Sequence, residues 1–70
     1  MKYCVVGYEK GQETPWILPT EREETPNELL NYLVNAYKDT KELFFMLEEL
    51  HITDEKGVIL ARYRAEIDEN

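Results

Sequence analysis

The sequence has few of the residues that small proteins use for covalent or metal-based stability. Among its 70 residues there is one cysteine, Cys4, and one histidine, His51. A single cysteine excludes a disulfide within the chain, and a structural zinc site needs about four cysteine or histidine ligands. We therefore expect no metal and no cofactor. A lone thiol is typical of a reducing compartment, which favours the cytoplasm.

Long hydrophobic runs are also absent. The longest continuous apolar segment, residues 43–47, reads Leu-Phe-Phe-Met-Leu. It is far shorter than the roughly 20 residues that a membrane span requires. The first residues of the chain resemble a strand rather than the apolar core of a signal peptide. We therefore expect no membrane partner.

Basic residues are outnumbered by acidic ones. The chain has 8 lysines and arginines against 15 aspartates and glutamates, a formal net charge of −7. A field of this sign repels phosphate backbones and anionic lipids, so direct nucleic-acid binding is disfavoured, whereas a basic protein is attracted. The charge also promotes solubility, because small domains commonly carry a net charge of this size.

The usual catalytic combinations are missing. The chain has no serine, and its three glycines are too scattered for a phosphate-binding loop. Cys4 and His51 are the only thiol and the only imidazole, and His51 falls near the predicted junction of helix and strand. Lone residues of these types are mostly structural or surface groups. We therefore expect no enzymatic activity.

The first quarter of the chain predicts two strands. Residues 2–9 are rich in β-branched and aromatic side chains on both faces, which predicts a strand inside a sheet. Residues 15–19 place three large apolar residues between two prolines, which predicts at best a short edge strand paired with the first. Residues 20–25 are polar and predict a solvated loop.

The clearest local signal is a helix start. Thr25-Pro26-Asn27-Glu28 combines a capping hydroxyl, a proline at the first helical position and a glutamate three residues after the cap. The apolar residues that follow recur at helical spacing, namely Leu29, Leu30, Leu33, Val34 and Tyr37. We predict helix to about residue 49, bent or broken near residues 38–40, with Asp39 as a candidate cap for a second segment. A strand within residues 42–49 is the alternative that the sequence leaves open.

The last part of the chain predicts a β-hairpin. Residues 54–57, Asp-Glu-Lys-Gly, form a turn that Gly57 can close in the left-handed conformation. Alternation in the strand after the turn predicts one buried face, made of Ile59, Ala61, Tyr63, Ala65 and Ile67.

The order β-β-α-β-β predicts an α+β fold. We expect a small antiparallel sheet packed on one face by a single helix, bent near residues 38–40, in one compact domain over residues 1–70. A chain of this length buries only about 60% of the surface that its unfolded form exposes. Its core is therefore small, and self-association into a homo-oligomer is one way to supplement it.

Two features are candidate partner-binding surfaces. Trp16, between its prolines, is either an interface anchor or a lid over one end of the core. The second feature is the acidic set around the helix start, which is Glu21, Glu23, Glu24 and Glu28. Such a set can bind in a basic groove of a partner protein, as the acidic face of a DNA-mimic inhibitor does. The alternative interpretation is that these residues are only a solvated surface with no partner.

The sequence therefore favours a small acidic protein-binding or regulatory accessory protein without catalytic activity, similar in size and acidity to accessory proteins of phages or mobile elements. The expected partner is a protein, and a basic one if the acidic set is used. A self-associating structural module and an acidic DNA-mimic inhibitor are the alternatives.

Overall fold

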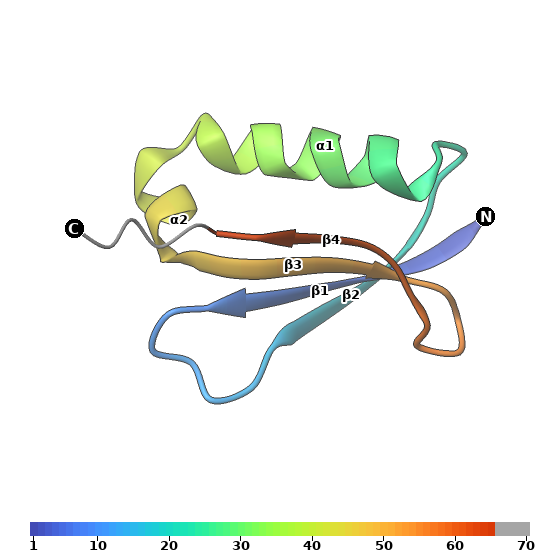
Figure 1. Cartoon of the computed structure of the whole chain (residues 1–70), viewed down its shortest axis with the longest axis horizontal. Coiled ribbons are helices and arrows are strands. Elements are labelled where there is room, and N and C mark those ends of the chain that lie inside the picture. Colours follow the sequence, from blue (N-terminus) through green and yellow to red (C-terminus); the bar gives the residue numbers. More distant parts are fainter. Residues whose placement is uncertain (66–70) are drawn as a thin grey trace.

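The computed structural model describes residues 1–65 and has two layers, a sheet and a helical layer on one of its faces (Figure 1). The strands are β1 (Lys2–Glu9), β2 (Trp16–Glu21), β3 (Leu47–Thr53) and β4 (Ile59–Arg64), and the helices are α1 (Pro26–Lys38) and α2 (Lys41–Met46). All neighbouring strands are antiparallel, in the spatial order β2-β1-β3-β4. The predicted α+β architecture is thus confirmed, with β1 inside the sheet and β2 at its edge.

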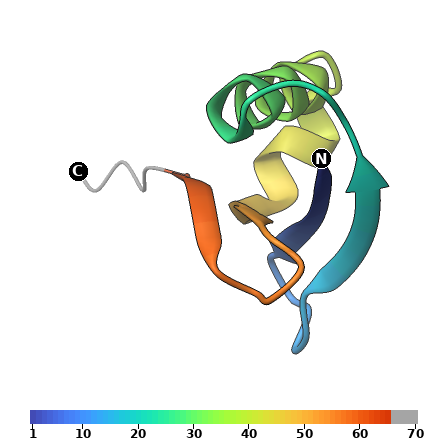
Figure 2. The same cartoon turned by 90° about the vertical axis from the view of Figure 1, so that its right-hand side faces the viewer.

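Strand register decides which side chains face the helices. Val5 lies opposite Leu18 on β2 and Ile52 on β3. Directly opposed residues share a face, and this is the core face, where Val5, Leu50 and Ile52 are buried. The residues that alternate with them point to the other side of the sheet, which neither helix covers (Figure 2). Helix α1 packs on β3 and β4 rather than on β2, which leaves Leu18 exposed on the helical side.

Helix α1 begins at the predicted capping box. The Glu28 backbone N–H donates to Thr25 Oγ1 at 3.2 Å, and the Thr25 backbone N–H donates to the Glu28 carboxylate at 3.1 Å. Pro26 holds the first helical position, where a backbone N–H would have no partner within the helix. The apolar stripe is confirmed, with Leu29, Leu30 and Val34 buried and Leu33 and Tyr37 packed against the core.

Thr25→Ala is expected to lower the free energy of unfolding by roughly 0.5–2 kcal/mol, because the Glu28 N–H loses its acceptor. Urea melts followed by circular dichroism measure the change. Thr14→Ala, at an exposed position in the β1–β2 connection, is the matched control and should change stability by less than about 0.5 kcal/mol. Equal losses in the two variants would show that the cap does not stabilise the helix.

The predicted bend near residues 38–40 is a complete break between two helices. Asp39 is the C-cap of α1, and its backbone N–H donates to the carbonyls of Asn35 and Tyr37. Thr40 holds the N-cap position of α2 without a side-chain hydrogen bond. The prediction that Asp39 caps the second segment is therefore wrong, because the chain uses that residue to end the first helix.

The prediction of helix to residue 49 extends too far, since β3 begins at Leu47. Leu47 is 1% exposed and lies opposite Glu9 at the end of β1. Burial against the sheet outweighs the helix propensity of Leu-Glu-Glu. The register with β1 then shifts, because Tyr8 pairs with Glu49, so Glu48 has no partner on β1 and forms a β-bulge. The strand alternative is correct for residues 47–49.

The hairpin between β3 and β4 is confirmed. Gly57 has a φ of 89°, in the left-handed region. The Asp54 carboxylate accepts hydrogen bonds from the backbone N–H groups of Lys56 and Val58, at 2.8 and 2.9 Å. These contacts fix the turn locally.

The predicted buried face of the last strand is only partly correct. A register shift at Ile52/Thr53 pairs Thr53 with Ile59, and Ile59 is 50% exposed. The bulge turns Ile59 away from the core, so the buried face starts at Ala61. Ile67 lies outside the described residues.

Candidate partner-binding surfaces

One face of the sheet carries no helix, and we call it the free face (Figure 2). Its members follow from the strand register. They are Glu21, Pro19 and Ile17 on β2; Lys2, Cys4, Val6 and Tyr8 on β1; Thr53, His51 and Glu49 on β3; and Ile59, Arg62 and Arg64 on β4. These side chains come from all four strands, so the free face spans the whole width of the sheet.

The middle of the free face is apolar. Val6 lies between Ile17 and His51, and Cys4 lies between Pro19 and Thr53. Ile17 is 62% exposed. Burial of apolar surface is favourable by roughly 25 cal/mol per Å². A second apolar surface that covered this strip of the sheet would therefore be bound favourably.

Charged side chains occupy the margins of the free face. Lys2 lies opposite Glu21 at one end, and Arg64 lies opposite Glu49 near the other, with Arg62 beside them on β4. The free face therefore has three basic and two acidic residues, whereas the whole chain has 8 basic and 15 acidic ones. The free face is close to neutral on an otherwise acidic molecule.

His51 lies in the middle of β3, not at the helix–strand junction that the sequence predicted. Its Nε2 is 3.2 Å from Glu49 Oε1, and its ring centroid is 5.2 Å from that of Tyr8. Cys4 is a diagonal neighbour of His51 on β1, and strand geometry places the Cα atoms of such a pair about 7–8 Å apart. Proton transfer requires heavy atoms about 3 Å apart, and no hydrogen bond joins the thiol to the imidazole within residues 1–65. The two groups do not form a nucleophile–base pair in this arrangement.

Trp16 lies on the helical side of the sheet, over Gly7. Its indole N–H donates to the Glu9 carboxylate at 2.8 Å, and its ring packs against the core. The ring lies so close to the strand that a Cβ atom at Gly7 would collide with it. This geometry fits the lid interpretation, because the indole N–H of Trp16 has a hydrogen-bond partner and the ring packs against the core beside Gly7.

The four acidic residues near the start of α1 differ in what they contact. The Glu28 carboxylate closes the capping box, and Glu24 forms an ion pair with Arg22 at 2.8 Å. The hydrogen bond from Arg22 lowers the pKa of Glu24. Glu21 and Glu23 are exposed and have no ion pair among the described residues. Only these two carboxylates are therefore available to a partner without loss of an internal contact.

The predicted site residues are not brought into one surface. Trp16 begins β2 and Glu21 ends it, a span of about 17 Å at the rise of a strand, and their side chains point to opposite faces. Sequence reasoning missed the free face as a site. The available signal was the two-sided apolar pattern of residues 2–9, which indicates an internal strand but does not tell which face another element covers.

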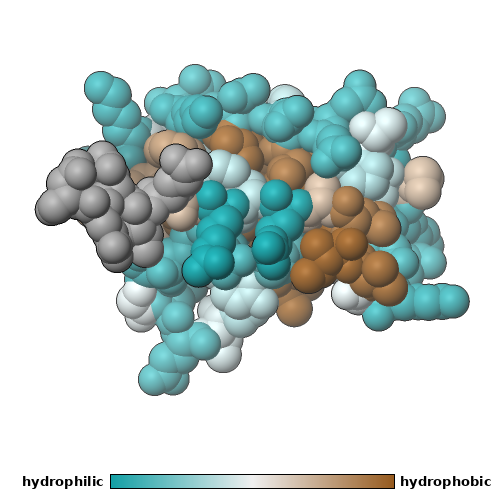
Figure 3. All heavy atoms as spheres, in the orientation of Figure 1, coloured by the Kyte–Doolittle hydropathy of each residue, from teal (hydrophilic) through white to brown (hydrophobic). Residues whose placement is uncertain are grey.

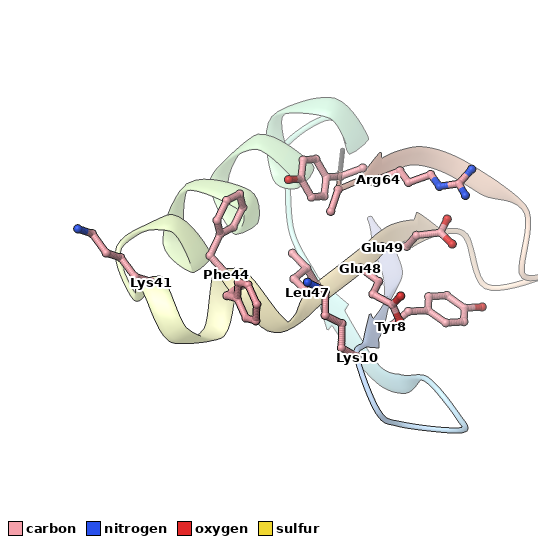
Figure 4. Close-up of a pocket in the computed structure, with 11 residues that line it drawn as sticks. Tyr8, Lys10, Lys41, Phe44, Leu47, Glu48, Glu49 and Arg64 are labelled. Atoms are coloured by element: carbon pink, nitrogen blue, oxygen red, sulfur yellow. The ribbon is translucent and has the colours of Figure 1, made fainter. Parts of the chain in front are cut away.

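A hollow of about 620 Å³ lies where α2 meets the ends of the strands (Figure 4). Phe44 and Leu47 contribute apolar lining, Lys41 extends outward from α2, and Lys10 Nζ sits 4.0 Å from the centroid of the Phe45 ring. No buried polar side-chain atom in the described part of the chain lacks a hydrogen-bond partner. The polar groups that line the hollow, among them Lys41, Glu48 and Arg64, therefore include no buried and unpaired atom that would mark a built ligand site.

A hydrophobic patch lies over the β3–β4 hairpin (Figure 3). The exposed apolar residues there are Val58, Ile59 and Leu60. Ile59 also belongs to the free face, so the patch extends the apolar middle of that face to the corner of the molecule.

Within residues 1–65, no helix has the length and apolar character needed to cross a membrane, and no group of three or more His, Cys, Asp or Glu side chains is placed to hold a metal ion. Comparison with known proteins gave no matching family model, no similar curated protein and no similar solved structure.

Proposed function

We propose that this protein is a small acidic protein-binding domain without catalytic activity, and that it docks through the free face. The observation that carries the proposal is a four-stranded sheet with helices on one side only and an apolar middle on the other. Exposed apolar patches with polar margins are typical of protein interaction sites.

The edges of the sheet are less suited to binding than the free face. Pro19 lies within edge strand β2, where it removes a backbone donor. Arg62 and Arg64 place two charges along the other edge strand, β4. The proline on β2 and the two arginines on β4 both discourage pairing with a further strand. Docking over the face avoids both obstacles.

The composition of the free face favours binding over catalysis. No hydrogen bond joins Cys4 to His51 within residues 1–65. Cys4 lines a hollow of about 480 Å³ beside Lys2, Pro19 and Glu21, and His51 is not among the residues that line it. We place the protein in the cytoplasm, because a single cysteine that is only partly buried suits a reducing compartment.

Ile17→Glu is expected to abolish the capture of partner proteins from a lysate of the native host. It places a charge in the apolar middle of the free face, where a docked surface would have to bury it unpaired. The matched control is Leu18→Glu, because Leu18 is the next residue on β2, is similarly exposed and points to the helical side. Affinity precipitation with each tagged variant, followed by mass spectrometry, measures the difference.

A basic partner held by the acidic residues would give a different result. In that case Glu21→Gln combined with Glu23→Gln would remove the captured protein, rising salt would elute it, and Ile17→Glu would retain it. That outcome would replace docking through the free face with the acidic-decoy interpretation.

A further inference from the structure

We propose that the occupant of the free face is a second copy of this chain, packed face to face in a symmetric dimer. The inference rests on the proposed function, in that it requires the free face to bind protein. It adds the identity of the partner.

The size of the free face suits a small dimer. Four strands about 4.8 Å apart, each with three or four side chains on this face at intervals of about 6.8 Å, give a footprint of roughly 400 Å² and an accessible area of roughly 500–600 Å². Two such faces would bury roughly 1,000–1,200 Å², which reaches the roughly 1,000 Å² that a biological interface needs and stays below the roughly 1,600 Å² of an average one. Each copy would then cover about a tenth of its 5472 Å² of accessible surface, the share that specific interfaces commonly take.

Charge favours a second copy on this face. Two chains of net charge −7 repel each other, so they can meet only where the local charge is small. The free face meets this condition, with Lys2, Arg62 and Arg64 against Glu21 and Glu49. Because it carries both signs at its margins, the face can be complementary to itself. A strongly basic partner would instead be drawn to the acidic surfaces elsewhere on the molecule.

The dimer would also add a second buried apolar layer to the small core of the monomer. The buried hydrophobic residues of the monomer all belong to α1 or to the core face of the sheet. Face-to-face packing of two sheets about 10 Å apart would create a second apolar layer from Cys4, Val6 and Ile17 of each copy. The assembly would have four layers, with helices outside and the two sheets in the middle.

Dimer formation is expected to strengthen as salt rises. Salt screens the repulsion between two acidic chains and affects apolar contact little. A complex held by attraction between an acidic and a basic protein weakens under the same change. The direction of the salt effect therefore separates the two modes of binding.

Sedimentation equilibrium of the purified full-length chain tests the proposal. We expect the mass to rise from one chain to two with concentration, at a dissociation constant that is lower in about 0.5 M than in about 0.05 M NaCl. Ile17→Glu should raise that constant by on the order of tenfold or more, as interface hot-spot changes do, whereas Leu18→Glu should leave it nearly unchanged. Circular dichroism spectra establish that both variants are folded.

A second pair of variants keeps the test independent of Ile17. Arg64→Glu makes the free face acidic and should weaken the dimer several-fold, whereas Lys56→Glu, an equal charge reversal at an exposed turn position, should weaken it less. A chain that stays monomeric at every concentration and salt overturns the second copy as occupant. The protein-binding proposal survives that result if lysate capture still depends on Ile17. A dimer that resists Ile17→Glu but is lost in Leu18→Glu would place the interface on the helical side and also overturn the inference.

Discussion

Leu50→Ala is expected to lower the free energy of unfolding by about 2–5 kcal/mol. Leu50 is 0% exposed on the central strand β3, where it lies opposite Gly7 on β1 and Tyr63 on β4. Truncation removes buried apolar area and leaves a cavity, because strands on both sides hold the surrounding backbone in place. Since small proteins have a total stability of about 5–15 kcal/mol, this single change would remove a large share of it.

Urea unfolding of Leu50→Ala measures the loss as a lower midpoint with an unchanged slope. Leu60→Ala is the matched control, because Leu60 has the same side chain on edge strand β4 and is 39% exposed. It should cost less than about 1 kcal/mol, since much of its side chain already contacts water. Similar losses in the two variants would mean that the core does not centre on β3.

Gly7→Ala is expected to destabilise the fold by about 1–3 kcal/mol. The added Cβ would collide with the indole ring of Trp16. The ring cannot move away freely, because its N–H donates to the Glu9 carboxylate and its body packs against the core. Elsewhere in a strand the same substitution would usually be favourable, because glycine has a high entropy in the unfolded chain.

A double-mutant cycle identifies the cause of this loss. In a Trp16→Ala background, Gly7→Ala should be neutral or slightly stabilising, because the colliding ring is gone. An equal cost in both backgrounds would contradict the contact and point to a backbone effect at Gly7. Circular dichroism serves as the probe of unfolding for all four proteins, because two of them lack the tryptophan.

The elements that could be predicted from sequence are those fixed by local chemistry. The capping box of Thr25 and Glu28 uses two side chains three residues apart, and the turn of Asp54 and Gly57 satisfies its own backbone groups. Both form through contacts within a few residues. The pattern at these positions therefore determines the structure without help from the rest of the chain.

Residues 42–49 could not be resolved in the same way. Their composition suits a helix as well as a buried strand, and the choice depends on the partner that each side chain finds. Leu47 is buried at the end of the sheet, next to Glu9 of β1, and this long-range contact ends the helix at Met46. The bulges at Glu48 and at the start of β4 depend on pairing between strands and have no local signal.

The candidate site was predicted less well than the fold. Acidic residues near the helix start were singled out for their charge, but Glu24 and Glu28 have contacts within the chain. Trp16 was a candidate because of its residue type, yet it covers Gly7 on the core side. The free face can be identified only when the strand register is known. Val6 and Ile17 are distant in sequence and become neighbours because β1 and β2 pair.

The reactivity of the Cys4 thiol is the most direct test of the proposal that the free face binds protein and pairs with a second copy. Cys4 is the only cysteine, is partly buried and lies in the apolar middle of the free face. If two copies pack over this face, the rate at which a small disulfide reagent modifies each thiol will fall as protein concentration rises, and Ile17→Glu will keep the rapid rate of the monomer. A rate that is the same at all concentrations, and the same in both proteins, would contradict face-to-face pairing.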